Sequence, residues 1–485
     1  MKKYYSILVG ILFCVGGSSV SASANMQEQD ALRLWRLHSQ QFAQQRQEQN
    51  IDSEQPTNEI TLEGESFQVE NNMESVGQAL YIALNRQLWR YAEQFLAQYE
   101  KFPDHKVQLA WFAKGALARE QGDLPEAERY YRKLLQSEPD FLRGQLDLAR
   151  ILFEDKKNTE STALFRQLSH HPLPDGVLLT IQDYQQALKE RENWNSSLTL
   201  GYLYHKNLNQ SSQRQLCLLE KEGQCFINRR SPDAINTYGW RYDFTAQRRI
   251  SLQNYHGLEF YFNGYGQFYP RHHDYDENAV KLYGGYSFRN AKTEMTAAPI
   301  LEYSTFGDHR YYHGWGAHLE WTQNISPRHS WNTQFEYKKL RYSQHYSAFD
   351  KTDVSTLFGT WYYLLTPQTT FFAGTDLSYR HTSDDTQSYR MLGARLGLNC
   401  QFDFGLNATV LALWRNYNYQ AYHAALELKR KDRQQIYLAI LKIPSWNFKD
   451  ITPYLLLKHT RNKSNADYVY SYKQSEIQLN FEWRF

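Results

Sequence analysis

Few residues of this sequence are spaced as a catalytic or metal-binding site requires. The densest polar cluster runs from Arg271 to Glu277, and His272, His273 and Asp274 within it could in principle bind a metal ion. Adjacent histidines are poorly placed to bind one ion together, so we expect no metal site there. Motifs of the forms G-x-S-x-G, H-E-x-x-H and C-x-x-C and a glycine-rich phosphate loop are absent. The sequence therefore predicts neither an enzyme nor a cofactor.

The first residues have the pattern of a secretory signal peptide. Lys2 and Lys3 precede an apolar run, and Ala22-Ser23-Ala24 supplies small residues at the positions that signal peptidase reads. We expect residues 1–24 to be removed by cleavage between Ala24 and Asn25.

Export would expose cysteines of the mature chain to an oxidising environment. Cys217 and Cys225 lie close together in the segment LCLLEKEGQCF, where an oxidising exterior would allow a disulfide that closes a small loop. The alternative is a pair of free thiols in a loop. Cys400 lies on a predicted strand and is interpreted as a small packing residue.

The composition favours a membrane barrel over a membrane helix. Beyond the signal no run approaches the roughly 18 apolar residues that a spanning helix needs, and the mean hydropathy is -0.71. Yet the chain contains 37 Tyr and 12 Trp. A polar average with many aromatic residues fits strands that show lipid every second residue and carry aromatic girdles. The net charge of +2 gives no support to nucleic-acid binding.

Helical repeats are predicted in the first half of the chain. Residues 25–72 are interpreted as a polar tether followed by a small hairpin, EITLEGESFQVE. Residues 73–193 are interpreted as helix pairs repeating at about 34 residues, the tetratricopeptide period. The middle repeat is the clearest, and it has the expected aromatic, small, turn and terminating residues at Trp111, Gly115, Gly122, Ala127, Tyr131 and Pro139.

Stacked helix pairs of this kind form a short solenoid whose concave face usually holds a polypeptide. We expect four side chains to line that face: Phe112, Arg119, Arg150 and Glu154. The alternative for each of them is an ordinary position on a solvated helix.

From Trp194 to the end, the hydrophobic period drops to two, which is typical of half-lipid, half-water strands. We predict 14 strands, at 194–205, 236–252, 255–269, 278–288, 293–306, 311–324, 329–342, 351–364, 369–382, 388–402, 406–419, 433–443, 451–462 and 468–485. The connections alternate between short turns and longer loops, as in outer-membrane barrels with short periplasmic turns. The predicted fold is therefore helical repeats followed by a 14-stranded antiparallel transmembrane β-barrel over 194–485.

The last predicted strand carries the most specific single signal. Its aromatic and aliphatic residues alternate with polar ones and end on an aromatic residue, at Ile477, Leu479, Phe481, Trp483 and Phe485. This resembles the C-terminal β-signal that the outer-membrane barrel-assembly machinery reads. Catalytic groups of a barrel enzyme could come from several strands near one rim, so His313, His318 and Glu320 are not excluded. We interpret them as lumen or interface residues.

The whole pattern resembles the Slam family, the surface lipoprotein assembly modulators. The likeness rests on the combined architecture and on EITLEGESFQVE, LTLGYLYHKNLN, HGLEF and the terminal FEWRF. It implies a translocator in the outer membrane of a Gram-negative bacterium, with its N-terminal domain in the periplasm. It also implies client proteins that are surface lipoproteins or soluble haemophore-like proteins. Outer-membrane lipid and periplasmic chaperones are the further expected partners.

Two other functions remain open at this point. A polysaccharide-export porin also combines tetratricopeptide repeats with a barrel, although it usually carries a longer array and a larger barrel. A passive nutrient or haem receptor would require an N-terminal plug domain, and nothing before residue 194 looks like one.

Overall fold

The computed structural model describes residues 69–221, 224–424 and 426–485, and at 216–221 and 225–229 it describes the backbone alone. The predicted cleavage site at Ala24 and Asn25, the tether, and most of the hairpin EITLEGESFQVE lie outside the described residues. These three features stay predictions.

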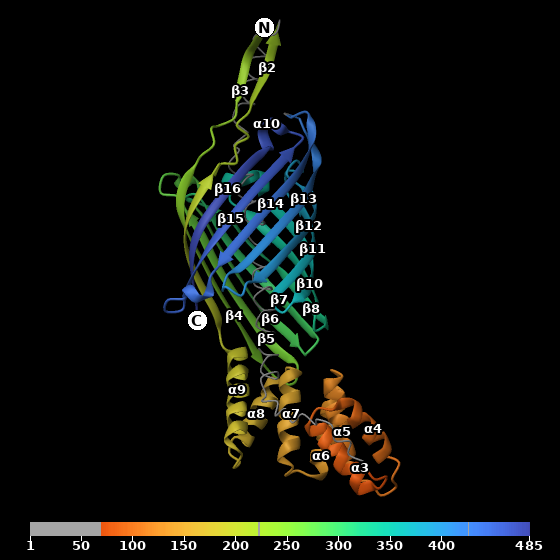
Figure 1. Cartoon of the computed structure of the whole chain (residues 1–485). Coiled ribbons are helices and arrows are strands. Elements are labelled where there is room, and N and C mark those ends of the chain that lie inside the picture. The colour runs from red at the N-terminus through yellow and green to blue at the C-terminus, as the bar shows by residue number, and fades with distance from the viewer. Residues whose placement is uncertain (1–68, 222–223, 425) are drawn as a thin grey trace.

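Helices and strands occupy separate parts of the molecule (Figure 1). A group of helices lies beneath one end of a β-barrel, and a two-stranded ribbon projects from the other end. The predicted fold class, helical repeats followed by a 14-stranded antiparallel barrel, is confirmed.

The helical part consists of antiparallel pairs followed by one longer helix. Its elements are α3 (Met73–Asn85), α4 (Trp89–Tyr99), α5 (Val107–Glu120), α6 (Leu124–Ser137), α7 (Leu142–Glu154), α8 (Asn158–Leu168) and α9 (Asp175–Glu192). Among the described residues, no helix is both long and apolar enough to cross a membrane.

Local sequence explains where these helices begin and turn. The Asn72 side chain accepts a hydrogen bond from the Ser75 N–H and so caps α3, and Asp123 caps α6 in the same way through Glu126. Gly122 has a φ of +74° between α5 and α6, a conformation that glycine adopts without steric cost. Gly115 lets these two helices approach, because a Cβ there would lie 2.6 Å from the Tyr131 ring.

The barrel is closed, with β1 hydrogen-bonded to both β4 and β16. Its strands are β1 (Asn195–Lys206), β4 (Thr237–Ser251), β5 (His256–Phe268), β6 (Glu277–Arg289), β7 (Thr293–Phe306), β8 (His309–Ser326), β9 (His329–Tyr342), β10 (Lys351–Thr366), β11 (Thr369–His381), β12 (Tyr389–Gln401), β13 (Asn407–His423), β14 (Leu428–Lys442), β15 (Ile451–Ser464) and β16 (Tyr472–Arg484).

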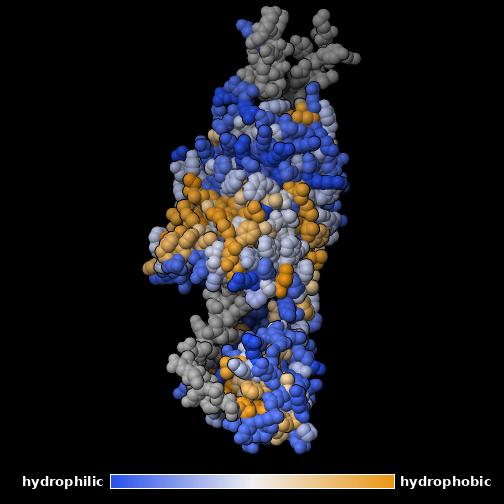
Figure 2. Space-filling model, turned by 45° about the vertical axis from the view of Figure 1, so that its right-hand side comes forward, coloured by the Kyte–Doolittle hydropathy of each residue, from blue (hydrophilic) through white to orange (hydrophobic). Residues whose placement is uncertain are grey.

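The two faces of each strand differ as the period-two pattern predicts. On β16, Leu479 and Phe481 are 47% and 46% exposed, whereas Gln478 and Asn480 are 2% and 0% exposed. Apolar side chains therefore face outward and polar ones face the lumen, the arrangement of a barrel in lipid. Figure 2 shows the result on one face of the barrel as an apolar belt across its middle, with hydrophilic surface above it.

The loops at the end of the barrel away from the helices contain several short elements. They are the two-stranded ribbon of β2 (Gln215–Lys221) and β3 (Gln224–Arg230), together with η2 (His273–Tyr275), η3 (Gln344–Phe349) and α10 (Asp467–Tyr470). On the helical side lies η4 (Pro444–Trp446). The ribbon falls within 206–235, where the sequence predicts only a loop.

We predict that the close approach at Gly115 is needed for the stability of the repeats. Gly115→Ala should lower their free energy of unfolding by about 1–2 kcal/mol, the cost of overpacking less the gain in helix propensity. Gly176→Ala is the matched control, because a Cβ there meets nothing within 4 Å. Circular dichroism of the helices during heating of the full chain measures both. Equal unfolding temperatures for the two variants would contradict the packing argument.

Candidate functional site: the barrel lumen and its helical mouth

Charged side chains from β6 to β9 meet inside the barrel. Lys281 Nζ lies 2.6 Å from a Glu336 carboxylate oxygen, and Lys338 Nζ lies 2.9 Å from a Glu302 oxygen. His318 Nδ1 is 3.1 Å from the same Glu336 oxygen, and its side chain is fully buried. Buried charges are tolerated only when they are paired in this way. The cluster therefore pairs two lysines and a histidine with two glutamates across four neighbouring strands.

A second charged cluster lies on β11, β12 and β13. Asp376 is fully buried and is shared by two guanidinium groups, with Arg395 Nε at 3.2 Å and Arg415 Nη2 at 3.1 Å. One carboxylate thus holds together three strands from inside the barrel.

Polar residues also meet inside the seam between β16, β1 and β4. Arg241 Nη1 donates to Gln478 at 2.8 Å, while Arg241 Nη2 lies 3.3 Å from Asp243. His205 is 2.8 Å from the Tyr269 hydroxyl and 3.6 Å from Glu476. The strands that close the barrel are therefore also joined by side chains in the lumen.

One sector of the inner wall is apolar instead. Buried aliphatic and aromatic side chains on β10, β11, β13, β14 and β15 pack together near the helical end of the barrel: Tyr362, Phe372, Leu411, Leu413, Ile436, Leu438, Tyr454 and Leu456. An extended polypeptide carries both polar backbone groups and apolar side chains. A wall with charged and apolar sectors is therefore chemically suited to such a ligand.

The helical part is attached to the barrel at the loop between α7 and α8. The Tyr255 hydroxyl, from the β4–β5 turn, donates a hydrogen bond of 2.5 Å to Asp155, and the Ala291 N–H, from the β6–β7 turn, lies 3.5 Å from the same carboxylate. The Lys157 ammonium is 4.9 Å from the centre of the Tyr255 ring. Asp155 is only 3% exposed, so this contact is buried.

Three further hydrogen bonds extend the attachment. The Asn158 amide donates to Ser251 at 3.2 Å, and the Thr159 hydroxyl donates to the Leu252 carbonyl at 2.7 Å. At the end of α9, the Glu192 carbonyl accepts from Arg248 at 3.0 Å. The helices are thus docked on the ends of β4, β5 and β6 as well as being joined covalently to β1.

The predicted groove residues do not share one environment. Phe112 is 4% exposed and packs edge-to-face against Tyr131 and Phe141, so its placement on an accessible concave face is corrected: it is a core residue. Arg119 donates through Nε to both oxygens of Glu154, at 2.9 and 3.1 Å, and joins α5 to α7. Arg119 and Glu154 are 25% and 19% exposed as side chains.

The other residues singled out from the sequence are placed as follows. His313 faces outward and His318 inward on β8. His273 is exposed and lies 2.9 Å from Asp276, whose carboxylate raises the pKa of that imidazole. Within the described part of the chain, no group of three or more His, Cys, Asp or Glu residues is placed to hold a metal ion.

The predicted disulfide is not tested. The side chains of Cys217 and Cys225 lie outside what is described, and the backbone register sets them opposite Asn228 and Glu220. Cys400 is a free, partly buried cysteine on β12.

Sequence reasoning missed the residues that build the site. Lys281, Glu302 and Asp376 are polar residues at inward positions of predicted strands, so a list of charged inward residues would have found them. Their pairings, and that of Asp155 with Tyr255, join residues far apart in the chain and carry no local signal.

Together these features define an outer-membrane β-barrel protein with helical repeats docked at one mouth. A family model described as "Surface lipoprotein assembly modifier" matches residues 194–485, and one for the N-terminal TPR repeats of these proteins matches 62–165. The chain belongs to the surface lipoprotein assembly modifier family, as its resemblance to Slam predicts.

Relatives cover nearly the whole chain. The hemophilin secretion modulator of Acinetobacter baumannii is 32% identical over 90% of both chains. A surface lipoprotein assembly modifier of Pasteurella multocida is 25% identical, covering 92% of this chain and 91% of its own. Surface lipoprotein assembly modifier 1 of Neisseria meningitidis is 23% identical, covering 90% and 89%. The barrel and the family together place the chain in the outer membrane.

We predict that Asp376 stabilises the barrel through its two arginines. Asp376→Ala should cost about 3–5 kcal/mol, because it leaves two buried guanidinium groups side by side without their carboxylate. Asp403→Ala is the control, since Asp403 lies exposed in a short turn. The temperature at which the folded barrel loses its distinct mobility on gels reports the difference. An unchanged temperature for Asp376→Ala would disprove the shared-carboxylate role.

We also predict that docking of the helices depends on pH. Burial raises the pKa of Asp155 above its ordinary value, although the Tyr255 hydroxyl acts in the opposite direction. A carboxyl whose pKa is higher in the docked state binds protons more tightly there. Docking should therefore strengthen as pH falls from about 7 towards the ordinary carboxyl range near about 4, and stay level below it.

Spin-label distances between α6 and the β8–β9 turn measure the docked population as a function of pH. Asp155→Asn should flatten the dependence, because the amide does not ionise. A dependence that survives in this variant would assign the titration to another group.

Proposed function

We propose that this chain moves client proteins across the outer membrane to the cell surface or exterior. Its relatives are named for surface lipoprotein assembly and for hemophilin secretion, which supports clients that are surface lipoproteins or soluble haemophore-like proteins. The observation that carries the proposal is the docking of the helical repeats at the mouth of the barrel through Asp155 and Tyr255. A client held by the repeats is thereby delivered next to the lumen.

The repeats are proposed to act in the periplasm as the capture element. Arg119, Arg150 and Glu154 remain the candidate client contacts on α5 and α7, with Phe112 supporting them from the core. The working division is a signal peptide at 1–24, a tether and hairpin at 25–72, repeats at 73–193 and a barrel at 194–485. Cleavage is proposed between Ala24 and Asn25, and a Cys217–Cys225 disulfide outside the cell.

Transport, not catalysis, is the proposed activity, and its driving force must come without nucleotide because the periplasm contains no ATP. Folding of the client outside, or handover from periplasmic chaperones, would supply it. The barrel-assembly machinery is proposed to read the outward residues of β16 and the residue that follows it, at Ile477, Leu479, Phe481, Trp483 and Phe485. A polysaccharide-export porin, the alternative function, is not favoured by the names of the relatives.

A surface-display assay tests the proposal. The full chain is co-expressed with a candidate haemophore or lipoprotein in a laboratory Gram-negative host, and client is scored in the medium and on intact cells. We expect client outside only when this chain is present. Client retained in the periplasm, with the barrel folded, would refute protein export.

Docking makes a sharper prediction. Combining Asp155→Ala with Tyr255→Phe removes the buried hydrogen bond, so delivery of client should fall several-fold while the barrel stays folded. Tyr238→Phe is the matched control, because Tyr238 faces outward and is 57% exposed. Spin-label distances between α6 and the β8–β9 turn verify that the helices of this variant are undocked, and full export by it would then show that capture needs no fixed position at the mouth.

A further inference from the structure

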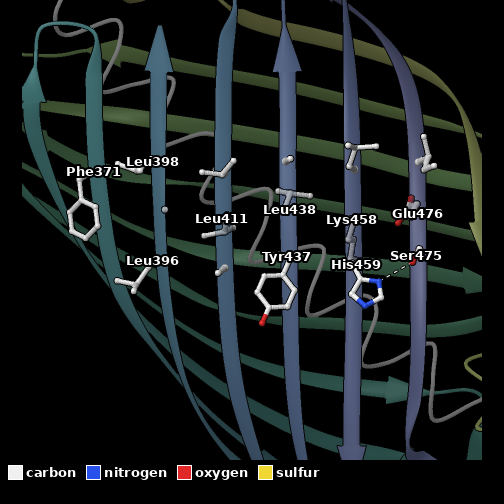
Figure 3. A pocket seen from close by; sticks show the side chains of 16 residues that line it. Phe371, Leu396, Leu398, Leu411, Tyr437, Leu438, Lys458, His459, Ser475 and Glu476 are labelled. Carbon is white, nitrogen blue, oxygen red and sulfur yellow. Dashed lines mark hydrogen bonds between the residues drawn. The ribbon is translucent and has the colours of Figure 1, made fainter. Parts of the chain in front are cut away.

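The outward wall of the barrel is hollowed between β11 and β16 (Figure 3). The hollow has a volume of about 610 Å³. Its floor is formed where the outward side chains are small, at Ala412 and Ala439, and larger outward residues such as Leu396, Tyr437 and Ile477 surround it. Because these residues face outward on a membrane barrel, the hollow opens towards lipid and fits an acyl chain.

A polar row marks the edge of this hollow on the side away from the helices. His459 Nδ1 lies 2.9 Å from the Ser475 hydroxyl, and the register places Tyr437, His459 and Ser475 side by side on β14, β15 and β16. The next outward residues beyond this row are Gln435, Arg461 and Lys473. The apolar belt therefore ends here, and headgroups of the outer leaflet begin.

Basic residues gather on the outward face just beyond the row. All of them are exposed, and on β14, β15 and β16 they are Lys429, Lys431, Arg433, Arg461, Lys463 and Lys473. Arg433 stands directly opposite Lys463, and Arg461 stands directly opposite Lys473. Like charges in facing positions destabilise a sheet unless an anion lies between them.

The inward face of the same strands contrasts with this surface. Arg430 is paired with Asp432 at 2.5 Å inside the barrel. Across the described residues, none of the six outward bases forms an ion pair with a carboxylate. The positive charge is thus neutralised inside and left exposed outside.

We propose that this surface binds an acylated, phosphorylated lipid of the outer leaflet. Its phosphate groups lie among Arg433, Arg461, Lys463 and Lys473, and one acyl chain lies in the hollow. Arginine and lysine clusters at a membrane surface recognise anionic headgroups, and Arg binds phosphate through two parallel hydrogen bonds. His459 and Ser475 lie between the two parts, where a lipid carries its ester, amide and hydroxyl groups.

The position of the surface selects a membrane lipid over a soluble phosphate compound. The apolar hollow and the basic cluster are contiguous on one outward face, so a single molecule with both kinds of group fills them. Lys473, Ser475 and Ile477 belong to β16, the strand that closes the barrel on β1. The bound lipid therefore lies beside the closing seam. This inference depends on the barrel standing in the outer membrane and not on protein export.

Binding of purified lipid A to the detergent-solubilised full chain tests the proposal. The variant R433Q/R461Q/K463Q should bind bisphosphorylated lipid A at least about tenfold more weakly, given roughly 1 kcal/mol per basic residue near a membrane surface. The control K339Q/R341Q/K351Q removes the same charge from the outward ends of β9 and β10, where Lys351 also faces Arg341 but Asp353 faces Lys339 and supplies a carboxylate. It should bind as the unaltered chain does. Distinct gel mobility of unheated samples verifies that each barrel is folded.

Two further probes separate the parts of the site. Dephosphorylated lipid A with the same acyl chains should bind the unaltered chain as weakly as lipid A binds the triple variant. Ala439→Trp fills the hollow, so it should weaken lipid A binding without changing binding of the deacylated, phosphorylated headgroup. Equal losses in the triple variant and its control, or equal binding of phosphorylated and dephosphorylated lipid, would overturn the proposal. Tight binding of the deacylated headgroup or of inorganic phosphate would assign the surface to a soluble anion.

Discussion

Closure of the barrel is the constraint on which the rest of the structure depends. Hydrocarbon offers no partner to a backbone N–H or C=O, so each strand must be hydrogen-bonded along both edges. β1 meets this requirement by pairing with β4 on one side and with β16 on the other, from Ser197 opposite Arg484 to Lys206 opposite Ser475. Closure also fixes which residues face lipid, because a slip by one residue would exchange the two faces of a strand.

The charge pairs of the lumen follow from closure. Once the register turns polar residues inward, lysine, arginine, aspartate and glutamate side chains lie buried inside the barrel, with little of their surface exposed. They are neutralised there by residues of other strands or by the residue two places along the same strand, as for Arg430 and Asp432, since immediate neighbours in the sequence face the opposite way. Lys281 on β6 therefore meets Glu336 on β9, and Asp376 on β11 meets Arg415 on β13. The same pairs that prevent uncompensated charge also tie together strands that are not hydrogen-bonded neighbours, β6 with β9 and β11 with β13.

The sequence predicts the features that depend on local periodicity and little else. β7 and β9 occupy 293–306 and 329–342 as predicted, because apolar and polar residues alternate cleanly there. β14 begins at Leu428, five residues before its prediction, because Lys429, Lys431 and Arg433 alternate with Arg430, Asp432 and Gln434. Where both faces are polar, hydrophobicity shows no period. Phe112 illustrates a related limit: helical spacing places it on one face of its helix, but only the packing of Tyr131 and Phe141 shows that this face is buried.

The helices contact one side of the barrel mouth, so the two sides of the barrel differ. Tyr255 and Ala291 hold the repeats beneath β4 to β7, and the closed strand order puts β11 to β14 on the opposite wall. The apolar inner sector, with Leu411 and Ile436, belongs to that opposite wall. Under the proposed function, a client delivered by the repeats enters beside the charged sector around Glu336 and faces the apolar sector across the lumen. An unfolded chain can then exchange its polar and apolar contacts between the two walls, so neither wall has to bind it tightly.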